Sequence, residues 1–224
     1  MRSPLASPTS QTCDRASFHL SFTSVIAQLH THLKTAKMLK SQSQLTLEEF
    51  LALPDNDVAY ELIDGQVVPK MSPKGFHAAV QSALLILLSQ WCEGRGRVYT
   101  EWAVTLKRRG KDWVPAPGLL YISYERLPAD WMRDEACPTP CELAIEIISP
   151  GQTFGELTAK ATDYLAAGVL RVWIVDTQAR SITVFYPDAP PQTCTGTMSL
   201  ADLILPELQL TPDQIFQKAG LSTK

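Results

Sequence analysis

Blocks of apolar residues at two different spacings predict the secondary structure of this chain. Apolar positions recur at helical spacing within 75–92 and again within 157–165, so we expect packed helices there. Short apolar runs typical of buried strands lie at 119–122, 143–148, 172–176 and 181–186. Helices that alternate with strands in this order predict an α/β or α+β fold, in which helices flank a mixed β-sheet.

Two local signals define the first elements. Thr46 and Glu49 have capping-box spacing, which predicts a short helix that ends at Pro54. The Asp-Gly pair at 64–65 lies inside the run 60–68, and this dipeptide is typical of a tight hairpin turn. A helix followed by a β-hairpin is therefore expected at the start of the folded part.

The centre and the end of the chain carry weaker signals. Residues 98–106 have the composition of one strand, and the charged segment 107–112 that follows is typical of a turn. Residues 200–216 contain scattered apolar positions, and we expect this stretch to pack on the edge of the core.

Composition and charge narrow the class of protein. The hydrophobic content of 45% is enough for a sizeable core, so one main domain is expected. The net charge of −3 provides no global basic field, and any contact with nucleic acid must be local. Five scattered cysteines favour reduced thiols in the cytoplasm over a zinc site. No apolar run approaches the roughly 20 residues of a membrane span, so no membrane partner is expected.

The first 37 residues differ from the rest. They are rich in Ser and Thr and carry four basic residues against one acidic residue, a composition similar to a transit peptide. The alternative is sequence read from too early a start, with Met38 as the true first residue. We expect 1–37 to be a disordered extension or a misassigned start, and 38–224 to be the folded domain.

The strand at 143–148 contains an acid where an apolar residue would be expected. An ionised Glu146 is costly in such a buried strand unless a cation, backbone amides or a nearby arginine such as Arg171 pairs with it. On the following helix Lys160 borders the inward face, although a lysine there could also extend its ammonium into water. Together the two residues match a site for phosphodiester hydrolysis, in which a carboxylate holds Mg²⁺ and a lysine orients or deprotonates water.

Several ordered motifs resemble one family. The segment from Gln44 to Lys218 resembles the Uma-type restriction endonucleases of the PD-(D/E)XK nuclease superfamily. The motifs that carry this resemblance are Leu45-Thr46-Leu47-Glu48-Glu49-Phe50, Tyr60-Glu61-Leu62-Ile63-Asp64-Gly65, Met71-Ser72-Pro73 with His77, Ile145-Glu146-Ile147-Ile148-Ser149-Pro150, Lys160 with Tyr164, and Val172-Trp173-Ile174-Val175-Asp176.

The resemblance implies a fold, a cofactor and a partner. It implies a restriction-endonuclease-like core in which Glu61 and Glu146 bind Mg²⁺ or Mn²⁺ and Lys160 completes the catalytic set. It also implies DNA as the partner, and it favours a homodimer because nucleases of this superfamily often act as dimers. From the residues alone, Glu61 could equally be an exposed acid of the hairpin.

One position departs from the family pattern. Where the family has Pro-Asp before an apolar strand, this chain has Gly118, which carries no side chain to bind a metal. Asp112 lies six residues away, about 20 Å along an extended strand, and Glu142 is also remote from Glu146. Glu101 on a neighbouring strand could help, but the sequence does not place it.

Two functions are therefore open at this stage. The first is a Mg²⁺-dependent DNA endonuclease, weakened by the loss of one metal-binding aspartate. The second is a catalytically inactive protein of the nuclease fold with a binding or regulatory role. His77 is a further candidate for the site, although a lone histidine near a helix start is more often a capping or packing residue.

Overall fold

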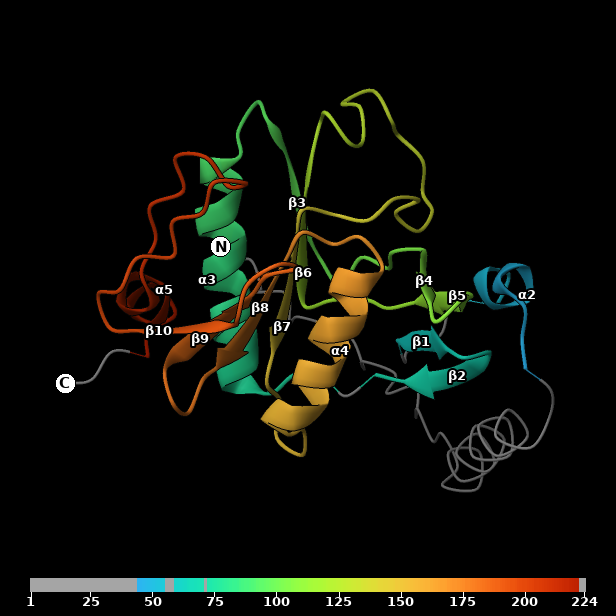
Figure 1. Ribbon diagram of the computed structural model, residues 1–224, viewed down its shortest axis with the longest axis horizontal. Coiled ribbons are helices and arrows are strands. Elements are labelled where there is room, and N and C mark those ends of the chain that lie inside the picture. The colour runs from blue at the N-terminus through green and yellow to red at the C-terminus, as the bar shows by residue number, and fades with distance from the viewer. Residues whose placement is uncertain (1–43, 55–58, 71, 222–224) are drawn as a thin grey trace, which may run out of the picture. The chain divides into compact units, whose positions relative to one another are not determined.

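The computed structural model describes residues 44–54, 59–70 and 72–221, which belong to one compact unit, Ser43–Lys224 (Figure 1). The predicted extension at 1–37 lies outside the described residues. The helices are α2 (Leu47–Leu51), α3 (Gly75–Trp91), α4 (Phe154–Ala166) and α5 (Pro212–Lys218). The strands are β1 (Tyr60–Ile63), β2 (Gln66–Pro69), β3 (Gly96–Thr100), β4 (Leu106–Arg108), β5 (Lys111–Val114), β6 (Leu119–Ser123), β7 (Leu143–Ile147), β8 (Arg171–Asp176), β9 (Ser181–Phe185) and β10 (Gln192–Thr195).

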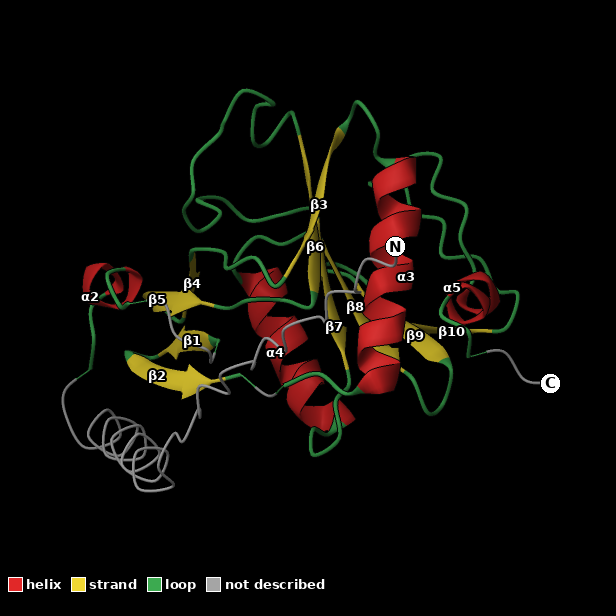
Figure 2. Ribbon diagram, turned by 180° about the vertical axis from the view of Figure 1, so that it is seen from behind, coloured by secondary structure: helices red, strands yellow, loops and turns green. Residues whose placement is uncertain are grey.

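The larger sheet positions the site. Its strands lie in the order β10-β9-β8-β7-β6-β3, and the central pair β7 and β8 is parallel and joined through α4. All other pairs in this sheet are antiparallel. Helix α3 lies on one face and α4 on the other, as the two opposite views show (Figure 2). This arrangement, helices around a mixed sheet, confirms the predicted fold class.

A second, smaller sheet was not predicted. It has the order β2-β1-β5-β4, all antiparallel, and lies beside α4 (Figure 1). One mixed sheet was expected from the sequence, because hairpin strands of three or four residues give no sign of which sheet they join. Trp113 on β5 packs against Tyr164 on α4, with ring centroids 4.7 Å apart, and so connects the small sheet to the helix.

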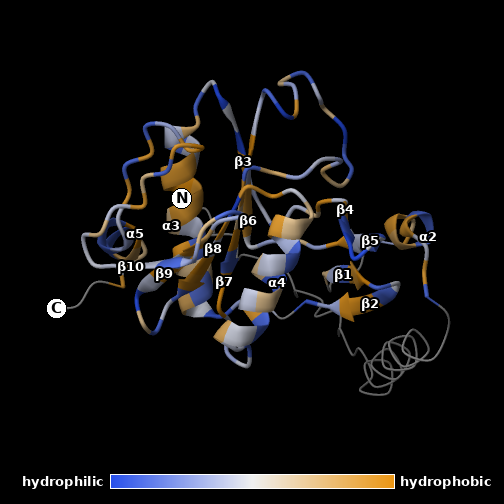
Figure 3. Ribbon diagram, viewed as in Figure 1, coloured by the Kyte–Doolittle hydropathy of each residue, from blue (hydrophilic) through white to orange (hydrophobic). Residues whose placement is uncertain are grey.

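Each face of the larger sheet has its own apolar core. On β7 the side chains of Leu143, Ile145 and Ile147 join the core that α3 and α5 cover, while Ala144 joins the core under α4. All five β7 residues are buried, because side chains of a strand alternate between two covered faces. The apolar central strands stand out in orange in Figure 3. Glu146 therefore belongs to the α4 face.

Most local predictions are confirmed. Thr46 and Glu49 form a capping box at α2, and Thr153 does the same for α4. The β1–β2 hairpin turns at Asp64 and Gly65, which both have positive φ angles of 52° and 82°, as a tight hairpin turn requires.

Three expectations at the centre and the end need correction. The strand predicted for 98–106 is interrupted after Thr100, where Glu101 adopts a positive φ of 54° and ends the ladder. Strand β10 was not predicted, since only Cys194 of its four residues is buried and the other three are polar and exposed. The stretch 200–216 packs into the core that includes α3, rather than only along an edge.

The described cysteines and helices also bear on two possibilities raised by the sequence, a metal site and a membrane-spanning segment. Cys92, Cys137, Cys141 and Cys194 are buried free thiols, and among the described residues no group of three or more His, Cys, Asp and Glu could hold a metal ion as the side chains stand. None of the helices within the described ranges has the length and apolar character needed to cross a membrane.

Candidate active site

The site is built where β7, α4 and β1 meet. Glu146 comes from the α4 face of β7 and is 5% exposed. Glu61 comes from β1 of the small sheet and is 7% exposed. On α4 the buried stripe is formed by Leu157, Ala161 and Tyr164, and Lys160 lies next to it. The fold thus brings together three residues that are up to 99 positions apart in the chain.

Lys160 connects the two carboxylates. Its Nζ lies 2.8 Å from Oε1 of Glu61 and 2.9 Å from Oε1 of Glu146. The hydroxyl of Tyr164 donates to the same Oε1 atom of Glu146 at 2.9 Å, and the backbone N–H of Ala116 donates to Oε1 of Glu61 at 3.1 Å. Each glutamate is therefore held through one oxygen, by a cation and by a second donor.

The electrostatics of this cluster fix the protonation of Lys160. Burial by itself lowers the pKa of the ammonium, but the charges of Glu146 and Glu61 and their hydrogen bonds outweigh it and raise the pKa well above its usual value. Burial, followed by the charge of Glu146, raises the pKa of Tyr164, so its hydroxyl stays a donor. At neutral pH Lys160 is a cation.

The second oxygen of each glutamate is not engaged. Oε2 of Glu61 and Oε2 of Glu146 accept no hydrogen bond from any residue that the structure describes, and neither atom is buried without a partner. Both glutamates and Lys160 line a cavity of about 460 Å³. Two carboxylate oxygens of residues that line this cavity are therefore left without a donor among the described residues.

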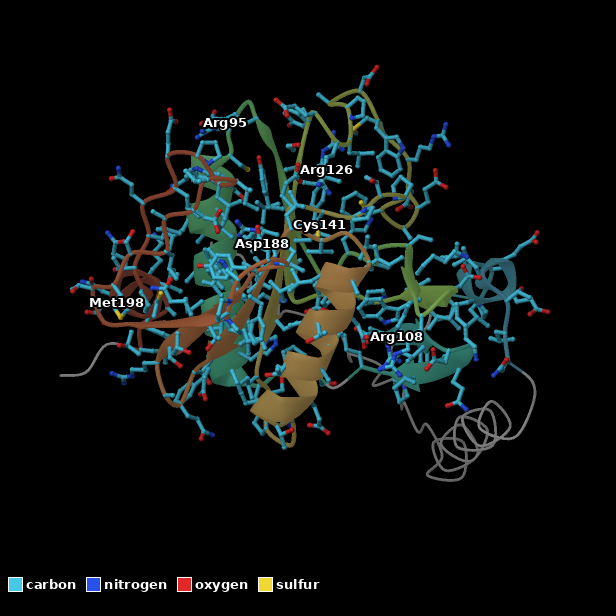
Figure 4. All side chains as sticks on the ribbon, viewed as in Figure 1. Arg95, Arg108, Arg126, Cys141, Asp188 and Met198 are labelled. Carbon is cyan, nitrogen blue, oxygen red and sulfur yellow. The ribbon has the colours of Figure 1, made fainter. Side chains whose placement is uncertain are left out.

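The cavity has mixed charge. Arg108, labelled in Figure 4, lines it and forms ion pairs with Asp163 at 2.6 Å and with Asp64 at 3.1 Å. Because Arg108 lies on β4 and Asp163 on α4, this ion pair also connects the small sheet with the helix.

Carboxylate oxygens that face a cavity suit a hard divalent cation. Mg²⁺ is usually held by one or two carboxylates together with substrate phosphate and water, and Mn²⁺ accepts the same donors. The two free Oε2 atoms of Glu61 and Glu146 therefore fit such a cation, although they supply fewer charged oxygens than three carboxylates would. This agrees with the finding that the described residues hold no three-membered metal group.

A second ionic cluster lines the same cavity, and the sequence analysis did not find it. Lys70 forms an ion pair with Glu101, and Gln81 donates to Oε1 of Glu101 at 2.7 Å and to the carbonyl oxygen of Gly118 at 2.9 Å. In the sequence, Glu101 is recognisable only as an acidic residue within a predicted strand. Its position at the cavity depends on how β3 pairs with β6, which the sequence does not reveal.

Gly118 stands on the wall of this cavity. A Cβ atom added there would lie 3.1 Å from the carbonyl oxygen of Ile145, which is a tight contact with the backbone of β7. The close approach of β7 thus explains why the smallest residue fits at this position.

Several alternatives from the sequence do not match the structure. Lys160 does not extend into water, because its side chain is only 19% exposed and both glutamates contact it. Glu61 is not an exposed hairpin acid. Arg171 pairs with Asp202 rather than with Glu146. His77 is buried and makes no capping hydrogen bond.

The acids considered as substitutes for an aspartate at position 118 fall into two groups. Asp112 pairs with Lys107 on the hairpin, and Glu142 accepts hydrogen bonds from Ser123, so neither lines the cavity. Glu101 does line it.

Comparisons with known proteins identify the family and agree with the fold. The model of the Uma2 family, described as putative restriction endonuclease, matches residues 47–213. This chain is similar to the crystal structure of a putative nuclease belonging to DUF820 from Anabaena variabilis, with a TM-score of 0.68 and 24% sequence identity. The match covers 78% of this chain and 99% of that chain, and at this identity it shows a shared fold. No curated protein matches the chain. Because the family model covers three quarters of the chain and every residue of the cavity, this chain belongs to the Uma2 restriction endonuclease family.

Proposed function

We propose that this protein is a nuclease that hydrolyses DNA with a divalent cation, Mg²⁺ or Mn²⁺, held by Glu61 and Glu146. The observation that carries the proposal is that two glutamates lining the cavity keep Oε2 without a donor among the described residues, while Lys160 holds both Oε1 atoms. DNA as the substrate is supported by the description of the family as restriction endonucleases.

Hydrolysis of a phosphodiester requires stabilisation of negative charge on the phosphoryl oxygens and a correctly placed water. A divalent cation, when bound, supplies Lewis-acid polarisation of the phosphate. Glu61 and Glu146 would hold it through oxygens whose positions Lys160, Tyr164 and the N–H of Ala116 already fix. Such prior orientation lowers the cost of reaching the transition state.

Lys160 has one of two roles that the sequence left open. A lysine whose pKa is raised is protonated at neutral pH, and so it is a poor base. Its ammonium instead neutralises the two carboxylates and stabilises developing negative charge on the phosphate. We therefore assign it the orienting and charge-stabilising role.

The test compares Lys160→Met with Lys218→Met, which removes an exposed lysine of α5 that makes no ion pair with a described residue. Plasmid and single-stranded DNA are incubated with each protein and Mg²⁺ or Mn²⁺. Loss of a positioned charge at the reacting phosphate predicts a rate at least about 100-fold lower for Lys160→Met. Lys218→Met should cleave like the parent, and equal rates for both variants would exclude the proposed role.

The alternative is an inactive protein of the nuclease fold with a binding role. Gly118 favours it, since this residue lines the cavity without contributing a carboxylate. The two functions differ in a calorimetric titration of the parent protein with Mn²⁺. A binding isotherm together with Mn²⁺-dependent cleavage supports the nuclease, whereas no binding heat and no cleavage in either metal support the alternative.

A further inference from the structure

A third glutamate faces the cavity from the end of β3. Glu101 lines the cavity together with Glu61 and Glu146, and its side chain is 37% exposed, so it is more accessible than the other two. Its carboxylate is held by Lys70 and Gln81, and no hydrogen bond joins it to Lys160. Glu101 therefore belongs to the cavity but not to the Lys160 cluster.

The sheet places Glu101 in line with Glu146. If the register of β3 with β6, and of β6 with β7, is extended by one position, it aligns Glu101, Gly118 and Glu146 in one row, although the positive φ of Glu101 ends the β3 ladder there. The backbone N–H of Glu101 donates to the carbonyl oxygen of Gly118 at 3.3 Å, as this row requires. Neighbouring strands lie about 4.8 Å apart, so the two outer backbones are separated by roughly 10 Å. The residue between them has no side chain.

Hydrogen bonds also link the two ionic clusters. The N–H of Ala116 donates to Glu61, and the carbonyl oxygen of Ala116 accepts from Lys70. One residue thus contacts a member of each cluster, Glu61 through its N–H and Lys70 through its carbonyl oxygen. The ammonium of Lys70 neutralises the charge of Glu101, which would otherwise repel the other carboxylates of the cavity.

A buried imidazole in the same cavity lacks a partner. His77 is 8% exposed and lines the cavity, and neither ring nitrogen makes a hydrogen bond with a described residue; Nδ1 is fully buried. Burial lowers the pKa of His77, against the charge of Glu101, which raises it, and with the charge of Lys70, which lowers it further. An unsatisfied buried polar group of this kind indicates a ligand that completes its surroundings.

We infer that Glu101 becomes a third ligand of the divalent cation once Lys70 and Gln81 release its two oxygens, because the described side chains form no three-membered metal group as they stand. Lys70 is then the counter-ion of Glu101 when the cation is absent. This inference rests on the proposed function, since it concerns the same cation. Three carboxylates hold a divalent cation more tightly than two, because affinity rises with the number of charged oxygens. The side chain of Lys70 is 18% exposed, and its long stem allows the ammonium to turn toward water once Glu101 is engaged.

The experiment is a calorimetric titration of Mn²⁺ into the full chain and four variants. Glu101→Gln keeps the shape of the side chain and removes its charge, and Glu93→Gln is the matched control at an exposed residue that makes no ion pair with a described residue. Lys70→Met removes the competing cation, with Lys111→Met as its exposed control. Thermal melting shows that each variant is folded.

The inference predicts opposite changes in the two informative variants. Glu101→Gln should bind Mn²⁺ at least about 10-fold more weakly, as expected when a charged ligand is lost. Lys70→Met should bind it more tightly, a result that a purely structural ion pair would not give. Both controls should match the parent. Unchanged affinity in either Glu101→Gln or Lys70→Met overturns the inference.

A further variant, Glu146→Gln, separates this inference from the proposed function. One outcome would be that the parent binds Mn²⁺, that Glu146→Gln abolishes this binding, and that Glu101→Gln leaves it unchanged. In that case the proposed function stands, but Glu101 is not a ligand. If the parent does not bind Mn²⁺, or Glu146→Gln binds it like the parent, both the proposed function and this inference fail.

Discussion

Two buried ionic clusters in this protein differ in how fully their oxygens are used. Arg171 and Asp202 form a two-pronged pair, with Nε to Oδ2 at 2.5 Å and Nη2 to Oδ1 at 3.1 Å, and the N–H of Ile204 also donates to Oδ1. Both oxygens of Asp202 are therefore occupied. In the Lys160 cluster each glutamate uses only Oε1.

The difference separates a structural ion pair from a candidate site. Side chains in both clusters are mostly buried, with Arg171 13% and Asp202 6% exposed, so burial alone does not distinguish them. Asp202 does not line the 460 Å³ cavity, whereas Glu61 and Glu146 do. Free acceptors beside a cavity thus distinguish the Lys160 cluster from the Arg171 pair. The Arg171 pair instead attaches the segment after β10 to the start of β8.

The largest effect on stability is expected for Arg171→Met. It leaves a buried Asp202 without its cation, and removing one partner of a buried pair costs about 4 kcal/mol of the free energy of unfolding. Urea unfolding measures this loss. Mn²⁺ affinity of the folded variant should equal that of the parent, and weaker binding would contradict the separation of the two clusters.

A smaller effect is expected from pH. The pKa of Lys160 is raised in the folded protein, so its ion pairs contribute fully to stability below the unfolded pKa of about 10.5 and are lost as the pH rises through the folded value. The difference in unfolding free energy between the parent and Lys160→Met should therefore shrink above pH 10.5. Buried tyrosines such as Tyr121, whose pKa burial raises to about 12, also lower stability there, but they do so in both proteins and largely cancel. A difference that grows with pH would contradict this assignment.

The smallest effect is expected for Tyr164→Phe. The ring still packs against Trp113, but Glu146 loses a donor, and a hydrogen bond to a charged group contributes about 2 kcal/mol. Chemical unfolding measures the loss, with Tyr99→Phe as the control because this half-exposed hydroxyl makes no hydrogen bond with a described residue. If Tyr164→Phe is as stable as the parent, the hydroxyl does not hold Glu146.

The sequence indicated the parts of the site that depend on local pattern. Glu146 and Lys160 were found because an acid in an apolar strand and a lysine beside a helical stripe are visible within 15 residues. Glu61 needed the family resemblance, since its contact with Lys160 joins positions 99 apart. The predicted roles of these three residues remain predictions.

What the sequence did not indicate depends on long-range pairing. The cluster of Lys70, Gln81 and Glu101 exists because β3 ends at Thr100, and the positive φ of Glu101 interrupts the strand that was predicted to continue. The second sheet likewise depends on the pairing of β1 with β5, which are separated by some 50 residues. The spacing of apolar residues within a short segment cannot reveal such a pairing.

The central claim is that carboxylates that line the cavity, and not buried charge in general, bind a divalent cation. A calorimetric titration of Mn²⁺ into the parent, Glu146→Gln and Asp202→Asn tests it, because each variant removes the charge of one buried acid. The account predicts binding by the parent and by folded Asp202→Asn, and none by Glu146→Gln. Binding by Glu146→Gln at the parent's affinity, or no binding by the parent, would contradict it.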